Sequence, residues 1–289
     1  MPGKFLPASA RLLLEWVASL GHRALQLKTI KSYISAVCSL HVDKGLPFNA
    51  CESETVHHVI RGIKHFYGEK ACCPKIPILL STLQQLATLS GDLRNHFNAA
   101  FDAAIKLAWS TFLCCGEFML GTSKKFNPSV HLMRSSVTFL SSFETPAYIC
   151  LNLPGSKTDP FCKGVSVLVS AALGSSTCPV SALKHLFCIN PQPASSPLFS
   201  GPDDAPLSCS TFISTLKTCL LATSLNSLLY SGHSFRCGAA SATASVGYAD
   251  HEIQLLGRWH SDAYKLYINV SRDWVLGLSA HLHLAVLPA

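Results

Sequence analysis

Charge is scarce in this chain of 289 residues: only 13% of the residues are charged, against 48% that are hydrophobic. A chain with this balance can bury a core and does not belong to the disordered class. Long hydrophobic runs are lacking as well, since no window reaches the roughly 20 apolar residues that span a bilayer. The apolar run near the start is too short for a secretory signal. We therefore expect an intracellular protein without a membrane partner.

Cysteine is abundant but lacks any repeated spacing. The thirteen cysteines are an odd number and include two adjacent pairs, Cys72-Cys73 and Cys114-Cys115. A zinc site needs pairs of ligands at a regular separation, and no such pattern occurs. We expect reduced, largely buried thiols and no metal ion. Internal repeats are absent too.

The few charges are unevenly distributed. Residues 1–77 hold ten Lys and Arg against five Asp and Glu, a net charge of +5, whereas the other 212 residues contribute only +2. A basic N-terminal quarter suits contact with a polyanion, of which nucleic acid is the commonest. Charge alone also fits an ordinary solvated surface.

Helical spacing of apolar residues dominates the first seventy positions. The predicted helices cover residues 9–20, 29–41 and 53–67, which together make a small bundle. Basic side chains lie on the second and third of these helices, away from the apolar stripes. The DNA-binding candidates among them are Lys28, Lys31, Arg61 and Lys64. Solvated helix faces are the simpler alternative for all four.

Residues 69–77 interrupt the helical pattern and contain two prolines, which helices avoid. We therefore predict a domain at 1–70, a linker at 71–78 and a second domain at 79–289. The second domain combines helical patterns with three strand patterns. The helices are expected near 81–90, 96–114, 179–187 and 210–221, and the strands at 136–140, 148–153 and 165–169. Turn residues at 154–160 favour a hairpin between the last two strands. The predicted fold is mainly α, a small helical bundle followed by a mixed domain with a small three-stranded antiparallel sheet.

Near the C-terminus, His233-Ser-Phe-Arg236 places a histidine and an arginine one helical turn apart. Arginine presents a planar fork of donors that fits two phosphate oxygens, and histidine can donate or move a proton. Leu256-Gly-Arg-Trp259 and Tyr264-Lys-Leu-Tyr267 follow. Breaking a phosphodiester through a tyrosine needs this combination. The small residues at 238–247 would let the intervening helix pack closely on a neighbour. An isolated pair of this kind is common by chance, so simple core packing stays open.

Residues 228–270 resemble the C-terminal half of the catalytic domain of tyrosine recombinases, the phage-integrase-like family. The likeness is strongest to recombinases of eukaryotic mobile elements of the Crypton and DIRS type. The matching stretches are His233-Ser-Phe-Arg236 and the residues at 253–259 and 261–268. Upstream, residues 29–37 and 59–64 resemble the family's core-binding (SAM-like) domain, and Ser156-Lys-Thr-Asp-Pro-Phe161 resembles its β-hairpin lysine segment. The resemblance covers most of the chain.

The resemblance implies a role for each matching residue. Tyr267 would attack the scissile phosphate and form a 3′-phosphotyrosyl link, which needs neither a metal nor a cofactor. Arg236 would bind the non-bridging oxygens, and His233 would donate a hydrogen bond or shuttle a proton. Lys157 in the hairpin turn would protonate the leaving 5′-oxygen. An ordinary solvated lysine is the alternative for Lys157.

Two positions near the tyrosine leave a choice open. Trp259 takes the family's His/Trp place, although Arg258 stands one residue nearer the usual spacing to the tyrosine; Arg258 is also a DNA-binding candidate. Tyr264 competes with Tyr267 for the role of nucleophile. Tyr267 is favoured because the family's tyrosine follows the glycine of Leu-Gly, here Gly257, by about ten residues, as it does in this chain. Either tyrosine is otherwise a packed aromatic.

The departure from the family pattern lies at Cys114. The family carries an arginine three residues before a glutamate; here Glu117 is present, but Cys114 occupies the arginine position. A neutral thiol cannot make the bidentate phosphate contact, and loss of such a donor typically lowers a rate by about 10²–10³. Arg134 or Lys124 would have to reach in to replace it.

Three functions follow. The first is a tyrosine recombinase that breaks and rejoins double-stranded DNA in recombination and integration, in the nucleus and as part of a mobile element. The alternative is a decayed or co-opted recombinase, impaired by Cys114, that only binds DNA. A third is a helical interaction protein in which every motif is core packing. In the resembling recombinases a terminal helix docks into a neighbouring protomer, which for the apolar C-terminal stretch at 275–287 implies self-assembly on DNA; folding onto its own domain is the alternative.

Overall fold

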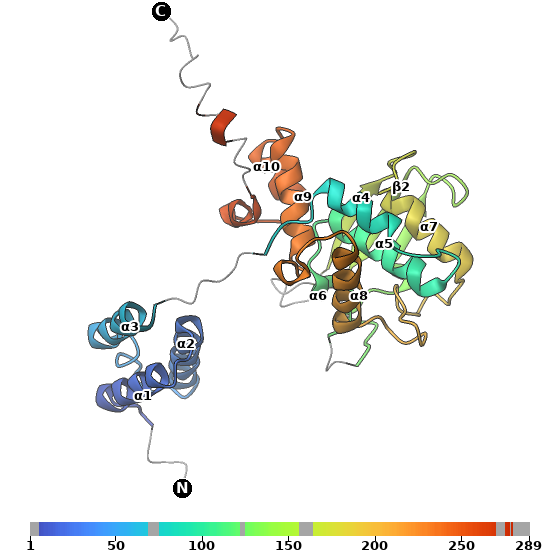
Figure 1. The fold of residues 1–289 in the computed structure, drawn as a ribbon. Coiled ribbons are helices and arrows are strands. Elements are labelled where there is room, and N and C mark those ends of the chain that lie inside the picture. Colours follow the sequence, from blue (N-terminus) through green and yellow to red (C-terminus); the bar gives the residue numbers. More distant parts are fainter. Residues whose placement is uncertain are drawn as a thin grey trace, which may run out of the picture. The chain divides into compact units, whose positions relative to one another are not determined.

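A computed structural model describes residues 6–68, 75–121, 125–155, 164–269, 275–277 and 279. The chain divides into two compact units, Met1–Cys73 and Pro74–Ala289 (Figure 1). The fold class is as predicted: both units are mainly helical, and the second contains a small three-stranded antiparallel sheet.

The first unit is a bundle of three helices, α1 (Ala10–His22), α2 (Leu27–Asp43) and α3 (Glu54–Tyr67). All three occupy the segments that the apolar spacing predicts. Ser9 and Ser53 cap α1 and α3 by accepting hydrogen bonds from backbone N–H groups of the first turn. The core between the helices is formed by Leu13, Val17, Leu20, Ile30, Ile34, Cys51, Val56 and Ile60.

In the second unit several other helices pack around α5, and the sheet buries one of its faces. Its elements are α4 (Leu80–Thr88), α5 (His96–Ser110), α6 (Cys115–Phe118), η1 (Arg134–Ser136), β1 (Val137–Leu140), β2 (Tyr148–Leu153), β3 (Val165–Ser170), α7 (Pro179–Ile189), α8 (Cys209–Ala222), η2 (Ser227–Leu229), α9 (Ser234–Ser245), α10 (Asp250–Gly257) and η3 (Asp262–Tyr267). The strands pair in the order β1-β2-β3, both pairs antiparallel. The pairing of Leu153 with Val165 closes the predicted hairpin. Its turn, which includes Lys157, lies outside the described residues.

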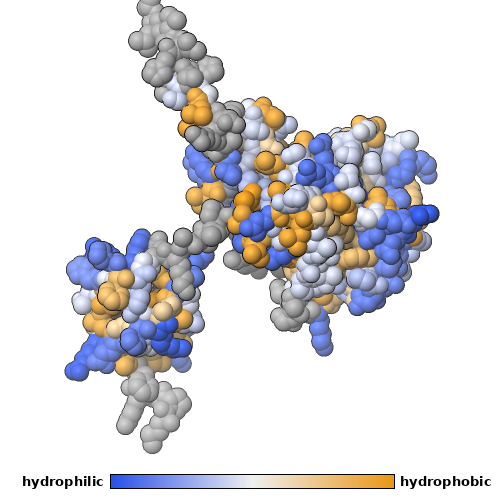
Figure 2. Space-filling view, in the orientation of Figure 1, coloured by the Kyte–Doolittle hydropathy of each residue, from blue (hydrophilic) through white to orange (hydrophobic). Residues whose placement is uncertain are grey.

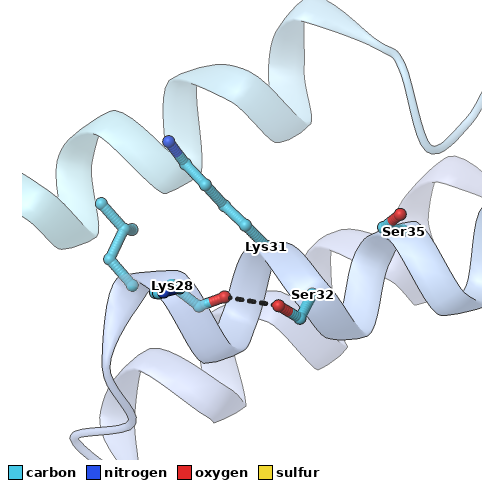
Figure 3. A pocket seen from close by; sticks show the side chains of 5 residues that line it. Lys28, Lys31, Ser32 and Ser35 are labelled. Atoms are coloured by element: carbon cyan, nitrogen blue, oxygen red, sulfur yellow. Dashed lines mark hydrogen bonds between the residues drawn. The ribbon is translucent and has the colours of Figure 1, made fainter. Parts of the chain in front are cut away.

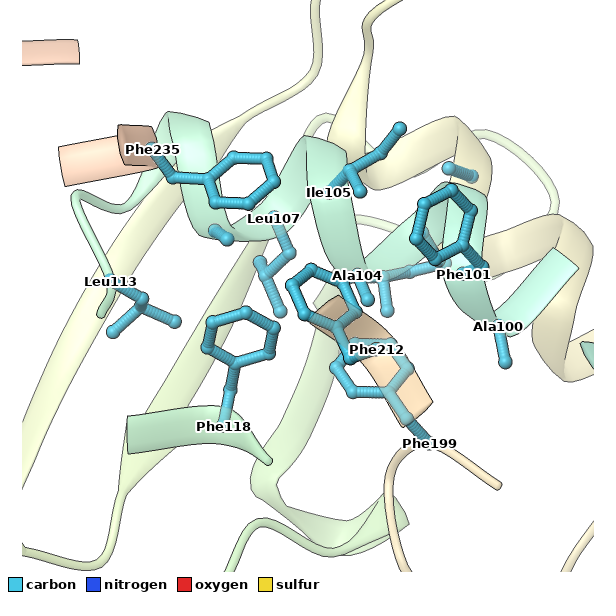
Figure 4. Close-up of a cluster of buried hydrophobic side chains, with 14 of the residues drawn as sticks. Ala100, Phe101, Ala104, Ile105, Leu107, Leu113, Phe118, Phe199, Phe212 and Phe235 are labelled. Carbon is cyan, nitrogen blue, oxygen red and sulfur yellow. The ribbon is translucent and has the colours of Figure 1, made fainter. Parts of the chain in front are cut away.

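Aromatic packing at the centre of the second unit fixes the short helix α6 against α9 (Figure 4). The ring of Phe212 on α8 lies 5.3 Å from that of Phe118 on α6 and 5.8 Å from that of Phe235 on α9, between ring centroids. Phe101 of α5 completes the cluster at 5.6 Å from Phe212. Since Phe118 and Phe235 are fully or almost fully buried, the residues beside them are held in place by the core.

Helix α5 is buried on every side, from Ala99 to Ala108. Two charged residues lie within that stretch, and they pair with each other: the Lys106 ammonium donates to the Asp102 carboxylate at 2.6 Å. Ser90 also donates to Asp102. Pairing is required because an isolated buried charge is strongly unfavourable.

Residues 75–78 fall in the predicted linker, and in the structure they lie along the second unit. The backbone N–H groups of Ile76 and Ile78 donate to the carbonyls of Leu229 and Ser234. The indole of Trp109 donates to the Ile78 carbonyl at 2.9 Å. Gly238 of α9 permits this approach, because a Cβ atom there would stand 1.9 Å from the Ile78 oxygen. Where the chain enters this unit, hydrophobic residues gather on its surface (Figure 2).

Candidate active site

The site begins where the chain leaves α5. Phe112 has a left-handed backbone, with φ of +54°, and Cys114 is the N-cap of α6. The Glu117 side chain turns back so that its Oε2 accepts a hydrogen bond from the Cys114 backbone N–H at 2.7 Å. This contact leaves the other carboxylate oxygen, Oε1, facing out of the turn toward α10.

Helix α9 brings Arg236 to the same place. His233 is the N-cap of α9 and Arg236 lies in its first turn. One guanidinium nitrogen, Nη1, is 3.4 Å from Glu117 Oε2 and donates to Cys114 Sγ at 3.4 Å. The other, Nη2, donates to the carbonyl of Gly257 at 2.8 Å. Three residues from two separate stretches of the chain, Cys114 and Glu117 from one and Gly257 from the other, thus converge on one guanidinium.

The Cys114 thiol occupies the space between Arg236 and His233. Its Sγ lies 3.1 Å from Nδ1 of His233. Burial raises the pKa of the Cys114 thiol, and the nearby Arg236 guanidinium only partly opposes this shift. The thiol is therefore uncharged near neutral pH and adds no negative charge to the site.

Arg258 supplies a second guanidinium. It is the C-cap of α10 and has a left-handed backbone, φ +59° and ψ +41°. Nη1 donates to the carbonyl of Thr111 at 2.7 Å, and Nη2 lies 3.4 Å from Glu117 Oε1. The Glu117 carboxylate therefore bridges Arg236 and Arg258, and each of these three side chains is 15% exposed. The sequence marks Arg258 as a possible DNA contact but carries no sign of its contact with Glu117.

Aromatic rings cover Arg236. The Arg236 guanidinium lies over the Trp259 ring, 4.9 Å from its centroid, and 5.9 Å from the centroid of Tyr267. The Trp259 and Tyr267 rings are 5.3 Å apart, and the His233 and Tyr267 rings 6.3 Å. Tyr267 is half-buried, whereas Tyr264 is completely buried. Burial also raises the pKa of the Tyr264 phenol.

The segment that carries Tyr267 is attached to α9 by Ser241. The Ser241 hydroxyl donates to the Tyr267 carbonyl at 3.4 Å and accepts from the Asn269 N–H at 2.8 Å. Beside it, Ala239 and Ala240 are buried against Phe112, and Tyr267 packs on this cluster. The close packing expected of the small residues on this helix is present. The sequence does not mark Ser241 as a residue of the site, because one serine in a run of small residues does not stand out.

This geometry can be compared with that of known proteins. No family model and no curated protein matches the chain. Among solved structures, the Tn1549 transposon integrase in complex with circular intermediate DNA aligns with 96% of this chain and 86% of its own, at 12% identity and a TM-score of 0.56. XerA recombinase aligns at 13% identity and a TM-score of 0.51, covering 97% of this chain and 91% of its own. A lambda integrase dimer bound to a core site aligns at 13% and 0.51, covering 95% and 85%.

The fold is that of the tyrosine recombinases. At 12–13% identity, the likeness establishes the fold alone. It extends over both units of the chain, since each of these structures covers at least 95% of it.

Two cations, Lys124 and Arg134, are candidates to replace the arginine missing at Cys114. Lys124 lies outside the described residues. Arg134 is buried in η1, just before β1, where its guanidinium lies over the Phe187 ring of α7, 4.5 Å from the centroid. Burial lowers the pKa of Arg134 to about 10. Arg134 therefore lies against α7, whereas Arg258 lies beside Glu117.

The basic candidates of the first unit lie on α2 and α3. Lys28 and Lys31 line a shallow pocket on α2 together with Leu27, Ser32 and Ser35 (Figure 3). Lys31 and Arg61 line a second, adjoining pocket between α2 and α3. Arg61 forms an exposed ion pair with Glu54 at 3.6 Å, and Lys64 is exposed on α3. The four are spread over the adjoining faces of two helices, as the sequence predicts.

Other kinds of site find no support in the part of the chain that the structure describes. Within it, no group of three or more His, Cys, Asp or Glu could hold a metal ion. Every described cysteine is a free thiol. No described helix is long and apolar enough to cross a membrane.

Proposed function

We propose that this protein binds double-stranded DNA and breaks and rejoins it through a covalent link to Tyr267. The observation that carries the proposal is the meeting of Tyr267, Arg236 and His233 at one partly exposed site, from segments that the recombinase fold brings together. The solved structures of this fold include an integrase in complex with circular intermediate DNA and an integrase dimer on a core site. Their fold supports DNA as the substrate here.

The proposed reaction is a transesterification. The Tyr267 oxygen attacks phosphorus, a P–O bond to the tyrosine forms, and the bond from phosphorus to the 5′-oxygen breaks. Arg236 stabilises the negative charge that gathers on the non-bridging oxygens. His233 assists by donating a hydrogen bond or moving the phenol proton, and Lys157 gives a proton to the leaving 5′-oxygen. Reversal of these steps rejoins the strand, because the phosphotyrosyl link keeps the energy of the phosphodiester.

Glu117 and Trp259 act as positioning residues on this proposal. Glu117 holds the Arg236 guanidinium from one side, and Trp259 supports it from a ring face. The indole also packs on the Tyr267 ring. Gly257 leaves room for the Trp259 ring, because a Cβ atom there would stand 1.7 Å from it. A preorganised site of this kind needs little rearrangement in the transition state.

DNA binding itself is assigned to both units. The first contributes Lys28, Lys31, Arg61 and Lys64 to the phosphate backbone, and the second contributes Arg258. Contacts of this kind release counterions, so affinity falls steeply with salt. We expect deletion of residues 1–68 to lower the affinity for duplex DNA and to flatten its salt dependence, measured by fluorescence anisotropy. Unchanged affinity after the deletion would exclude a role for the first unit.

A second candidate function is favoured by Cys114, which places a neutral thiol beside Arg236 where the resemblance calls for an arginine. On this alternative the protein grips DNA without cleaving it. The two candidates predict the same binding and differ in the covalent step only.

Trapping of a covalent protein–DNA complex distinguishes the two candidate functions. The substrate is a pool of nicked duplexes with a randomised centre, from which a cleaved strand cannot be rejoined. The active-enzyme proposal expects a denaturation-resistant adduct that disappears in Tyr267→Phe and persists in the matched control Tyr264→Phe. If the natural chain gives no adduct but Cys114→Arg does, the protein is a DNA binder with an impaired site. If Cys114→Arg also gives none, cleavage by Tyr267 is wrong.

We also propose that the gene derives from a eukaryotic mobile element of the Crypton or DIRS type, that the protein acts in the nucleus and that it assembles on DNA. The stretch from Leu256 to Tyr267 supports the first point through its resemblance to those recombinases, and nuclear action follows from it. The lambda integrase dimer on its core site supports the last. Fluorescence microscopy of the tagged chain and mass photometry with and without DNA test these points.

A further inference from the structure

We propose that Arg258 replaces the arginine missing at Cys114, so that Arg258 and Arg236 together form a two-arginine cradle for one phosphate group. This assignment rests on the proposed function, because it names a second residue that holds the same phosphate. On this proposal, the phosphate contact expected of an arginine at position 114 is made by Arg258, from another segment of the chain.

The charges around Glu117 support the cradle. One carboxylate faces two guanidiniums, Arg236 through Oε2 and Arg258 through Oε1. The neighbouring Cys114 thiol is neutral, so these four side chains carry a net charge of +1. Among the described residues, no second carboxylate forms an ion pair with either arginine. A partly buried surplus of positive charge is stabilised by an anion.

The hydrogen bonds are also incomplete. Both arginine–Glu117 distances are 3.4 Å, whereas charge-assisted bonds usually measure about 2.7–2.9 Å. The Nε of Arg236 is buried and has no hydrogen-bond partner within the described part of the chain. Neither guanidinium is therefore saturated by the carboxylate. A tetrahedral anion offers the additional acceptor oxygens that these donors lack.

The backbone of Arg258 points the same way. Its left-handed conformation at the end of a helix is the place where glycine is usual, since a side chain there is strained. Strain that persists at one residue is a sign of function when that side chain lies in a site. The Arg258 side chain does so, and its contact with the Thr111 carbonyl at 2.7 Å holds it there. From this turn the guanidinium reaches Glu117 of α6.

A double-mutant cycle tests the assignment. Cys114→Arg and Arg258→Ala are made singly and together in the full chain, and two quantities are measured. One is the dissociation constant for inorganic tungstate, a tetrahedral dianion that stands for phosphate, by isothermal titration calorimetry. The other is the yield of the covalent adduct with the nicked duplex pool.

In the natural background we expect Arg258→Ala to weaken tungstate binding by about tenfold or more, the effect of losing charge-assisted bonds. In the Cys114→Arg background the same change should cost less than about threefold, because the restored arginine takes over. Arg258→Gly should match Arg258→Ala, which rules out backbone strain as the cause. Arg94→Ala is the matched control: Arg94 is an exposed arginine of the same unit, paired with Asp92, and its loss should change neither quantity.

The outcomes separate the two proposals. Equal losses in both backgrounds, or no tungstate binding by the natural chain, would overturn the role of Arg258. If adducts form and do not depend on Arg258 in the natural background, the cradle is wrong while cleavage by Tyr267 stands. If tungstate binding follows the expected cycle but no variant forms an adduct, the cradle stands and cleavage is wrong.

Discussion

Arg258 should lower the stability of the protein through its backbone while it serves the site through its side chain. A residue other than glycine in the left-handed region costs about 1–2 kcal/mol. Against this, the charge-assisted bond to the Thr111 carbonyl contributes about 1.5–3 kcal/mol. Arg258→Ala keeps the strain and loses the bond, so we expect a loss of about 1.5–3 kcal/mol in the free energy of unfolding. Arg258→Gly loses the same bond but relieves the strain, so it should be the more stable of the two by about 1 kcal/mol.

Differential scanning calorimetry measures this difference, since the two units can unfold as separate transitions. For a unit of this size, about 1 kcal/mol corresponds to a shift of about 2–4 °C in the melting temperature. Ser224 is a matched control because it too has a left-handed φ, of +60°; its Gly variant should likewise exceed its Ala variant. An Ala variant at 258 that equals or exceeds the Gly variant in stability refutes the reasoning. Such a result would mean that the turn is not strained, and it would remove the backbone argument for a functional role of Arg258.

Three further predictions concern the buried ion pair of α5 and two residues near the site. Lys106→Met should lower the free energy of unfolding by about 3–5 kcal/mol at pH 7, because it leaves the Asp102 charge buried and unpaired. Burial already raises the pKa of Asp102, so protonation of Asp102 favours the folded state and the loss of stability should shrink as the pH falls toward 4. Urea unfolding at pH 7 and at pH 4 measures this loss. A loss that does not depend on pH would argue against a buried charge. Tyr264→Phe should change the free energy of unfolding by less than about 1 kcal/mol and leave the covalent adduct intact, which a gel assay checks; loss of the adduct would reopen the choice of nucleophile. Ser241→Ala should lower the adduct yield through a looser Tyr267 while leaving the affinity for duplex DNA unchanged, and a parallel loss of affinity would show a general defect of folding instead.

Local patterns were enough to predict most of the longer elements of this fold. The helix expected at 96–114 is shorter, because α5 ends at Ser110, Phe112 has a left-handed backbone and α6 follows as a separate helix. The helices of the first unit follow from apolar residues at helical spacing, and Ser9 and Ser53 mark two of their starts. The hairpin of β2 and β3 follows from strand patterns on either side of turn residues. These features depend on neighbours in the sequence, so a single chain contains the information. The resemblance to tyrosine recombinases added the order of the motifs, and the fold agrees with it.

The contacts of the site were only partly predictable. The spacing from His233 to Arg236 indicates that both lie at one helix end, and the motif order places Tyr267 near them. The contact of Cys114 with His233 joins residues 119 positions apart, and no local pattern encodes it. Arg258 reaches Glu117 from a left-handed backbone, a conformation usual for glycine and not predicted for arginine. Tertiary packing decides such features.

The attachment of residues 75–78 has a consequence for dividing the chain into pieces. A C-terminal fragment that starts at Leu79 lacks the carbonyl that binds Trp109 and the backbone that fills the space beside Gly238. Such a fragment exposes one flank of α9, the helix that bears Arg236. A fragment that starts at Pro74 keeps residues 75–78 and their contacts. For biochemical work on the isolated second unit, the polypeptide should therefore begin at Pro74, because the shorter fragment lacks the contacts of residues 75–78 with α9.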